Sequence, residues 1–486
     1  MKIVFSKNDL MDFSKISGDK NPLHIDEVYA RKTSYGEVVV FGILALIKSL
    51  PTGINKPIKN IKVRFLKAIH LNQDYTSNYN NESADKTTYS LLMGSTPVMT
   101  VSLEFSNEKV FDQKSFEKTV HTHTVTKSEI NLNDMEKSLF SGQYSTDSAY
   151  IENILSTQKI STDNYDQIQS LIFSSYQIGM ISPGERALFL ELNLSFNRPT
   201  SQASQLINYE TKITKHDKRF DHLTYGISIQ SNSTQIASGS LKAFARPASS
   251  SNEEIIQTYK KEQNTDLMNK NVLIIGGSRG LGAHITALFA SRGTHCHVVY
   301  QNSVQEATLL KNEFKNISLY KADASICEDM DVVKKAIAEK NIFFDVVICT
   351  ATPPLQSLAI EITQFGKFEN FIKKSLNLAS IPLFIWNDDL TKNSGRYIFI
   401  SSTVVNEAVR EWPHYVASKC LAEGFIKTAA LQFKKINFLI LRPSRLDTDL
   451  TKGNIPTRDI ESAEVIARKV LDFCLNDDST DNLKII

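Results

Sequence analysis

Three residues late in the chain have the types and the spacing needed for proton transfer. Tyr415 and Lys419 are four residues apart, so on a helix their side chains share one face. Ser402 lies thirteen residues before Tyr415, just beyond a strand that we expect over Tyr397–Ile400. A tyrosine with its ordinary pKa of about 10 needs a cationic neighbour to work near neutral pH. The trio therefore predicts an acid–base site centred on Tyr415.

A glycine-rich segment predicts a dinucleotide site in the same region. The apolar run Asn271–Ile275 is typical of a buried strand, and it leads into Gly276-Gly-Ser278-Arg279-Gly280-Leu281-Gly282 and then a helical pattern. Glycines let the backbone turn tightly and approach a pyrophosphate, which then lies at the helix N-terminus, where free N–H groups favour an anion. The alternative is a glycine-rich turn that binds nothing.

The end of the second expected strand indicates which dinucleotide is bound. His297–Tyr300 is followed by Gln301-Asn302-Ser303, whereas NAD-preferring enzymes usually place an acidic residue here for the ribose 2′-hydroxyl. Because no acidic residue is present and Arg279 is available for a 2′-phosphate, we expect NADP(H). Arg279 as an ordinary solvated arginine is the alternative.

From Asn271 to Ile486 the chain resembles the short-chain dehydrogenase/reductase family. The motifs that carry the resemblance are IGGSRGLG, SS…YVASK, Asn377 in SLNLASIPLF, Asp323 in KADAS, and RPSRLDTDLT. The usual Asn-Asn-Ala-Gly is replaced by Cys349-Thr350-Ala351-Thr352, the first threonine of the glycine motif is Ile275, and the usual Pro-Gly is Pro443-Ser444.

The resemblance implies a role for each matching residue. Tyr415 would donate a proton to the carbonyl oxygen as hydride arrives, Lys419 would lower the pKa of the tyrosine and hold the nicotinamide ribose, and Ser402 would orient the carbonyl. Asn377 would complete a water-mediated proton relay, and Asp323 would bind the adenine. The remaining residues expected to contact the cofactor are those of the glycine motif and Ala351: Gly276, Ser278, Arg279, Gly280, Leu281, Gly282 and Ala351.

A second candidate site lies near the N-terminus, in Ser17-Gly-Asp19-Lys-Asn-Pro-Leu-His24-Ile-Asp. Asp19 and His24 flank a proline-fixed turn, and a loop carrying both groups can bind one water from two sides. The carboxylate and imidazole would then activate that water or protonate a departing hydroxyl. The alternative is a structural turn with a capping aspartate.

This loop and the Val40-Phe41-Gly42 segment resemble the MaoC-like (R)-specific enoyl-CoA hydratases over about Lys7 to Asn107. The resemblance implies a hot-dog fold in which the N–H of Gly42, at the start of the central helix, polarises the thioester carbonyl. The family often has Val-His-Gly where this chain has Phe41, so a neighbouring contact and the shape of the acyl pocket are expected to differ.

The first 246 residues contain this pattern twice: an apolar helix followed by long alternating strands. The first copy has a segment over Val38–Leu50, and the second has a helix over Tyr165–Gly179. We therefore expect two hot-dog repeats, although one irregular α+β domain is the alternative. The second repeat has no Asp-x4-His pair, so we expect it to be non-catalytic and to shape an acyl tunnel. His121 and His123 lack a third ligand nearby, which favours solvated strand histidines over a metal site.

The expected fold class is multidomain, α+β followed by α/β: a double hot-dog and then a Rossmann-like doubly wound parallel sheet. The expected domains are a catalytic hot-dog repeat over 1–110, a second repeat over 111–246, a polar linker over 247–270 and a reductase domain over 271–486.

Composition limits the function and the location. The net charge of +2 over 486 residues gives no reason to expect a nucleic-acid partner. No apolar run approaches the roughly 20 residues of a membrane span, and the N-terminus does not read as a signal peptide, so a cytoplasmic protein is expected. The five cysteines are widely spaced, which argues against disulfides and a metal site.

Together the two halves predict consecutive reactions: NADPH-dependent reduction of a 3-oxoacyl thioester to the (R)-3-hydroxyacyl thioester, and its dehydration to the trans-2-enoyl thioester, or the reverse hydration. The carrier would be coenzyme A or an acyl carrier protein, and we expect a homo-oligomer. One alternative keeps the reductase and makes the hot-dog half a non-catalytic acyl-binding and dimerisation module. Another gives the reductase a sugar or small alcohol substrate.

Overall fold

The computed structural model describes residues 2–107, 139–197, 205–246, 251–262, 264–446, 460–476 and 481–486. The chain divides between Ala248 and Ser249 into two compact units. His121 and His123 lie outside the described residues.

The first unit is built on a ten-stranded antiparallel sheet, in the order β1-β3-β4-β5-β2-β7-β10-β9-β8-β6. Alternating side chains are buried along β4 and β9, which is the pattern of strands with one face against a core. The strand bounds are β1 Lys2–Ile3, β2 Ile58–Phe65, β3 Tyr75–Ser83, β4 Lys86–Met93, β5 Thr96–Phe105, β6 Leu139–Ser145, β7 Ala187–Phe196, β8 Leu206–Asp217, β9 His222–Ser231 and β10 Thr234–Ala245.

The sheet consists of two halves with the same strand order. Strands β2-β5-β4-β3 in one half correspond to β7-β10-β9-β8 in the other, and the halves join where β2 pairs with β7, with Val63 opposite Leu192. Each half has its own central helix: α4 (Gly42–Ser49) and α6 (Tyr165–Tyr176). This arrangement confirms the duplicated hot-dog fold.

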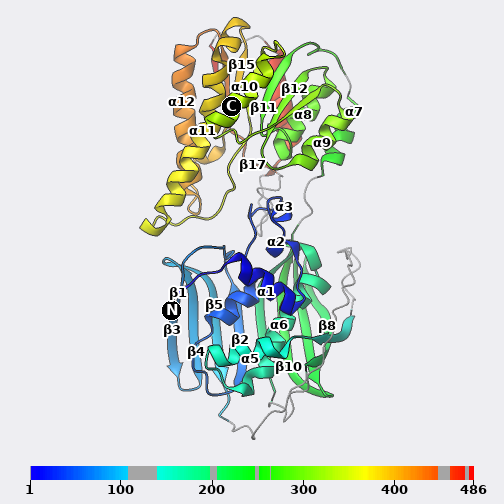
Figure 1. The fold of residues 1–486 in the computed structure, drawn as a ribbon, viewed down its shortest axis with the longest axis vertical. Helices are drawn as coiled ribbons and strands as arrows, with labels where there is room; N and C mark the ends of the chain where they lie inside the picture. Colours follow the sequence, from blue (N-terminus) through cyan, green and yellow to red (C-terminus); the bar gives the residue numbers. More distant parts are fainter. Residues whose placement is uncertain are drawn as a thin grey trace. The chain divides into compact units, whose positions relative to one another are not determined.

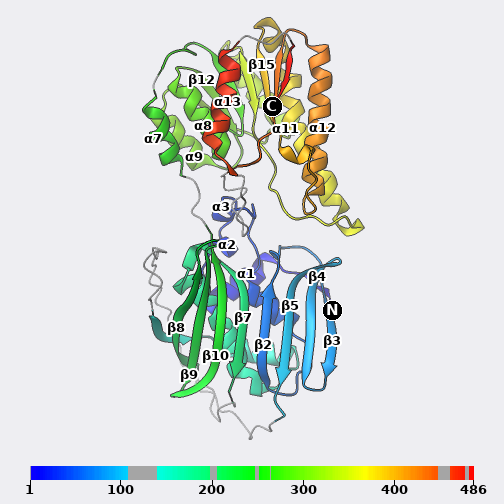
Figure 2. The ribbon, with the colours of Figure 1, turned by 180° about the vertical axis from the view of Figure 1, so that it is seen from behind.

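Helices cover one face of this sheet (Figure 1), and Figure 2 shows the opposite face, on which the described residues place no helix. The helices on this face are α1 (Lys7–Ser17) and α5 (Ser148–Thr157), together with α4 and α6. The short helices α2 (Pro22–Ile25) and α3 (Glu27–Ala30) follow α1 and lie beyond the ends of the strands. Helix α4 is apolar almost all round and its residues Ile43–Ile47 are buried, so it lies inside the core. Val39 and Val40 precede it as extended chain because their N–H groups donate to the carbonyls of Leu23 and Ile69.

The second unit is a seven-stranded parallel sheet in the order β13-β12-β11-β14-β15-β16-β19, which confirms the Rossmann-like fold. The strands are β11 Asn271–Ile275, β12 His295–Tyr300, β13 Ile317–Lys321, β14 Val346–Cys349, β15 Arg396–Ile400, β16 Asn437–Leu441 and β19 Leu483–Ile485. The direction of the strand order reverses between β11 and β14. In such sheets ligands bind at this point, outside the carboxyl ends of the strands.

Two separate apolar cores cover the two faces of this sheet. One is formed with α7 (Asn252–Lys260), α8 (Gly280–Ser291), α9 (Val304–Glu313) and α13 (Ala463–Leu475). The other is formed with α10 (Cys327–Ala338), α11 (Phe365–Lys392) and α12 (Pro413–Gln432). Helix α7 lies within the stretch that the sequence analysis treats as a linker, yet its Ile255, Ile256 and Tyr259 are buried in the first of these cores.

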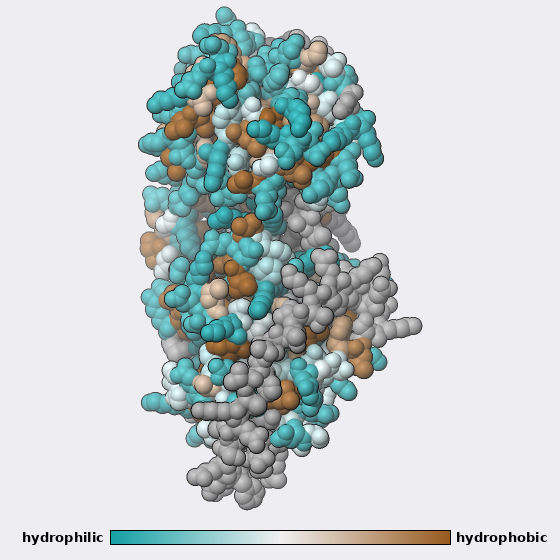
Figure 3. Space-filling model, turned by 45° about the vertical axis from the view of Figure 1, so that its right-hand side comes forward, coloured by the Kyte–Doolittle hydropathy of each residue, from teal (hydrophilic) through white to brown (hydrophobic). Residues whose placement is uncertain are grey.

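No helix among the described residues is long and apolar enough to cross a membrane. On the face drawn in Figure 3, hydrophobic side chains are interspersed with hydrophilic ones.

Candidate active sites

The structure brings Ser402, Tyr415 and Lys419 together at the carboxyl edge of the parallel sheet. Ser402 follows β15. Pro413 is the first residue of α12, a position where the missing backbone N–H costs no helical hydrogen bond. Tyr415 and Lys419 are four residues apart in this helix, so they lie on successive turns of the same face. The Lys419 ammonium lies 5.5 Å from the centroid of the Tyr415 ring and donates to the carbonyl of Ile400 over 2.8 Å. Ser402 hydrogen bonds with the Tyr415 side chain.

Burial controls the electrostatics of this centre. It raises the pKa of Tyr415, and the hydrogen bond with Ser402 opposes that shift. Burial also lowers the pKa of Lys419 to about 8, against the opposing influence of Cys349 and Glu423. The lysine is therefore close to its own titration point near neutral pH, unlike a solvated lysine.

Glu423 is a residue that the sequence analysis missed. It is 2% exposed, one helical turn beyond Lys419, and its carboxylate accepts from Ser401 (2.7 Å) and from Arg442 (2.6 and 2.9 Å). It thus ties the residue next to Ser402 to the helix that carries Lys419. The four-residue spacing from Lys419 is a signal that could have identified it.

The glycine segment forms a tight loop that fits a dinucleotide. Gly276 and Gly280 have φ of 84° and 54°, and a Cβ on Gly282 would come 2.1 Å from the carbonyl oxygen of Gly276. The loop ends at the N-terminus of α8, with Arg279 as the residue that precedes the helix. Ala351 lies against the loop, with its Cβ 2.9 Å from where a Cβ on Gly276 would be, and its N–H donates to Ile275. Ser278 and Leu281 are both buried.

Asp323 lies beyond β13, and its carboxylate accepts from the Ser325 backbone and hydroxyl and from the side chain of Gln301 over 2.7 Å. The structure therefore links Asp323 to the end of β12, where the cofactor ribose is expected. Asn377, on α11, donates to the carbonyl of Ser325 over 2.8 Å. This bond fixes its side chain, and the expected proton relay through Asn377 stays a prediction.

In the first unit, Asp19 is buried against α6, the central helix of the second repeat. It is 2% exposed, and its carboxylate accepts from the Ser175 hydroxyl (2.7 Å) and from the N–H of Asn21 (3.0 Å). Burial raises the pKa of Asp19 to about 7, which these two bonds oppose. A Cβ on Gly179 would come 2.2 Å from Oδ1 of Asp19, so the helix end must be glycine there.

Ser175 and Gly179 were also missed by the sequence analysis. Ser175 lies in α6 and Gly179 in the π-helical turn Gln177–Ile181 that follows it. No local signal connects Ser175 to a residue 156 positions earlier, although π-helical turns are frequent at functional sites.

His24 is held in one tautomer. Its Nδ1 lies 2.7 Å from the Val39 carbonyl, which can only accept, so Nδ1 carries the proton. Burial, with a smaller contribution from the charge of Arg246, lowers the pKa of His24 to about 4. Near neutral pH the ring is therefore uncharged and its Nε2 is a free base. Phe41 stacks on the imidazole at 4.0 Å between ring centroids.

Gly42 is the first residue of α4, so its N–H is among those with no partner inside the helix. A Cβ at this position would come 2.8 Å from the ring of Phe65, which excludes a larger residue without movement of that ring. Among the described residues, no group of three or more His, Cys, Asp or Glu side chains is placed to hold a metal ion.

Two family models match separate parts of the chain. Residues 1–88 match the MaoC like domain, and residues 270–459 match the short chain dehydrogenase family. The cyclic-di-GMP-binding biofilm dispersal mediator protein of Escherichia coli is 27% identical over 39% of this chain and 79% of its own length. The 3-oxoacyl-(acyl-carrier-protein) reductase of Chlamydia trachomatis is 27% identical over 38% of this chain and 78% of its own. The structure of a 3-oxoacyl-(acyl-carrier protein) reductase from Brucella melitensis is 16% identical, with a TM-score of 0.41, over 47% of this chain and 92% of that one.

The chain thus combines an N-terminal MaoC-like domain with a short-chain dehydrogenase domain that resembles 3-oxoacyl-acyl-carrier-protein reductases.

Proposed function

We propose that the protein reduces a 3-oxoacyl thioester with NADPH and dehydrates the resulting (R)-3-hydroxyacyl thioester to the trans-2-enoyl thioester, or catalyses the reverse hydration. The observation that carries this proposal is the presence of both sets of groups in one chain, because the product of a ketone reduction at C3 is the substrate of the dehydration. The thioester would be carried by coenzyme A or an acyl carrier protein, and we expect the protein to act as a homo-oligomer.

The glycine loop fits NADP(H). Gly276 and Gly280 have positive φ angles, and a side chain at position 282 would clash with the Gly276 carbonyl, so the loop presents bare backbone that a pyrophosphate can approach closely. Arg279 would face the 2′-phosphate, and Asp323 would accept from the adenine. The bound cofactor supplies the hydride that is added to C3. Tyr415 gives its proton to the carbonyl oxygen, Ser402 holds that oxygen, and the charge of Lys419 favours the tyrosinate that remains.

The dehydration uses groups in different protonation states. His24, neutral with a bare Nε2, removes the proton from C2. Asp19, with its pKa near 7, is largely protonated below that pH and gives its proton to the departing hydroxyl, so that water leaves. The N–H of Gly42, at the positive end of α4, stabilises the negative charge that develops on the thioester oxygen. The reverse sequence hydrates the enoyl thioester.

One observation favours a second candidate, a hot-dog half that only binds acyl chains. Both oxygens of Asp19 already accept hydrogen bonds and the side chain is 2% exposed, as expected of a structural carboxyl. In that case the protein is a single-function reductase.

An assay with acetoacetyl thioesters and NADPH distinguishes the two candidates, with NADPH oxidation and enoyl absorbance followed together on both carriers. Wild type should form the enoyl product, and Asp19→Asn should accumulate the 3-hydroxyacyl thioester. Asp26→Asn, in the same loop but exposed, is the matched control and should behave as wild type. If wild type stops at the hydroxyacyl product and cannot hydrate a crotonyl thioester, the bifunctional proposal is wrong.

A further inference from the structure

Helix α7 lies outside the part of the chain that matches the short chain dehydrogenase family, since that match begins at residue 270. Its buried face nevertheless belongs to the core of the second unit through Ile255, Ile256 and Tyr259. This helix is therefore part of the core of the second unit, although it precedes the matched residues.

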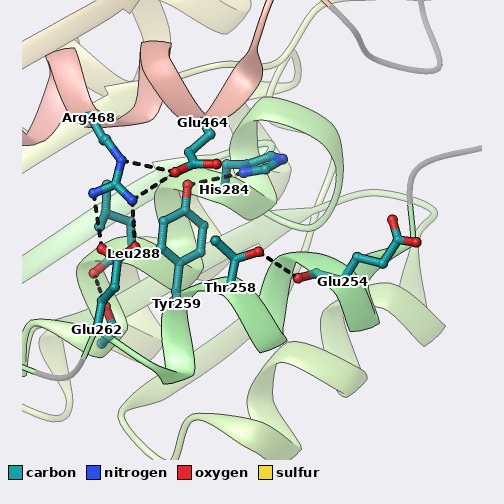
Figure 4. A network of polar contacts seen from close by, with 9 residues as sticks. Glu254, Thr258, Tyr259, Glu262, His284, Leu288, Glu464 and Arg468 are labelled. Carbon is teal, nitrogen blue, oxygen red and sulfur yellow. Dashed lines mark hydrogen bonds and ion pairs between the residues drawn. The ribbon is translucent and has the colours of Figure 1, made fainter.

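Polar contacts fix α7 to two helices on the same face of the sheet (Figure 4). The Tyr259 hydroxyl lies 3.1 Å from Nδ1 of His284 on α8. Arg468 on α13 donates to both carboxylate oxygens of Glu262, at 2.6 and 3.0 Å, and to Glu464 at 2.8 Å. Bidentate arginine–carboxylate pairs constrain geometry well. These contacts join α7 to α8, and Glu262, two residues beyond α7, to α13.

The first residue of α7, Asn252, reaches the cofactor loops themselves. It is 5% exposed, and its Nδ2 donates to the carbonyl of Ser278 over 2.9 Å and to the carbonyl of Glu306 over 3.2 Å. Ser278 lies in the glycine loop after β11, and Glu306 lies in the first turn of α9, after β12. One side-chain amide therefore joins the glycine loop to the first turn of α9, the two segments that would flank the pyrophosphate and the ribose.

The hydrogen bonds from Asn252 to the carbonyls of Ser278 and Glu306 also orient the peptide groups to which these carbonyls belong. The carbonyl of Ser278 and the N–H of Arg279 belong to one planar trans peptide, so they point in opposite directions. With the carbonyl turned toward Asn252, the N–H of Arg279 is turned away from α7. The bond to Glu306 likewise holds the first turn of α9, the helix that follows β12.

We propose that Asn252 is a positioning residue of the dinucleotide site: it sets the glycine loop and the start of α9 in the arrangement that binds NADPH. This inference rests on the proposed cofactor site. The residue acts before the cofactor arrives, so its loss should weaken NADPH binding while leaving hydride transfer at saturating NADPH nearly intact.

The test compares full-length Asn252→Ala with Tyr259→Phe, which removes the contact to His284 but keeps the buried ring. Asn252→Ala should raise the Kd and the KM for NADPH about five- to tenfold, the effect of about one lost hydrogen bond, with kcat within about twofold of wild type. Tyr259→Phe should lower the unfolding midpoint of the second unit and leave the Kd for NADPH unchanged.

Three results would overturn the role of Asn252: an unchanged Kd in Asn252→Ala, an equal rise in Kd in Tyr259→Phe, or a fall in kcat without a change in KM. Should Asn252→Ala fail to fold, Asn252→Ser keeps one donor of shorter reach and should give a smaller rise in Kd, and an unchanged Kd there counts against the role equally. Wild type that does not bind NADPH overturns the cofactor site itself, which separates that failure from failure of the Asn252 role alone.

Discussion

Replacing Asp19 with asparagine should slow dehydration strongly, and it should make the first unit more stable relative to wild type at pH 8 than at pH 5. Burial raises the pKa of this carboxyl from 3.8 to about 7. A carboxyl whose pKa is higher in the folded state contributes stability below its unfolded pKa, and that stability is lost as pH rises through the folded pKa. The charged form of Asp19 therefore opposes folding above about pH 7.

The size of the effect follows from the two pKa values. At pH 5 a carboxyl with a folded pKa near 7 is almost fully protonated, and at pH 8 it is almost fully ionised, which removes roughly 2 to 3 kcal/mol of stability between these pH values. Asparagine does not titrate. Its side chain has one acceptor oxygen for two donors, the Ser175 hydroxyl and the N–H of Asn21. The variant therefore loses the stability of up to about one hydrogen bond, and this loss is the same at every pH.

The quantity to measure is therefore the stability of Asp19→Asn minus that of wild type, at pH 5 and at pH 8. It should rise by roughly 2 to 3 kcal/mol between them. Urea unfolding followed by circular dichroism reports both units, while the two tryptophans, Trp386 and Trp412, lie in the second unit and report that unit alone. A stability difference that is the same at both pH values would refute the raised pKa and the argument built on it.

The catalytic effect of the same change is separable. Loss of acid–base help should reduce interconversion of enoyl and 3-hydroxyacyl thioesters roughly 10²- to 10⁴-fold, and ketone reduction should continue. Dehydration that persists near the wild-type rate in a folded Asp19→Asn protein would remove Asp19 from the mechanism.

Three further predictions concern the reductase. Tyr415→Phe should abolish NADPH-dependent reduction of a 3-oxoacyl thioester without unfolding the protein, as measured by NADPH absorbance; turnover near wild type would contradict the assignment. Arg279→Ala should narrow the preference for NADPH over NADH, measured as the ratio of the two Kd values, and a wild-type preference for NADH would overturn the cofactor assignment. Because burial lowers the pKa of Lys419 to about 8, kcat/KM for reduction should fall as pH rises through about 8, when the lysine loses its charge; a profile flat to pH 10 would show that Lys419 does not titrate there.

Much of the fold follows from patterns that are local in the sequence. Alternation along β7 and the buried run before Gly276 predicted strands correctly, because each strand must place its side chains against a core. The strands β13 and β19 were not predicted: ISLYK is only partly buried and LKI is three residues long, so neither carries a clear pattern. Helix α7 lies in the stretch expected to be a polar linker, and its burial depends on α8 and α13, which its own sequence does not reveal.

The candidate sites divide in the same way. Residues related by helical spacing or by a motif, such as Tyr415 with Lys419, could be found from the sequence, and the structure brings them together. Ser175 and Asn252 could not, because each acts through a partner in another element, at a separation that only folding closes. Their burial requires a hydrogen-bond partner but does not identify it.

The antiparallel pairing of β2 with β7 makes two equivalent halves into one continuous sheet within a single chain. In an assembly of two identical subunits, any substitution in one copy appears in the other, so both copies must serve every role. Covalent duplication removes that constraint. Here Asp19 comes from the first half and the hydroxyl that contacts it, Ser175, from the second, so each half can change independently. The second half can therefore hold a serine at position 175 and a glycine at position 179 against Asp19, while the first half carries the loop with Asp19 and His24.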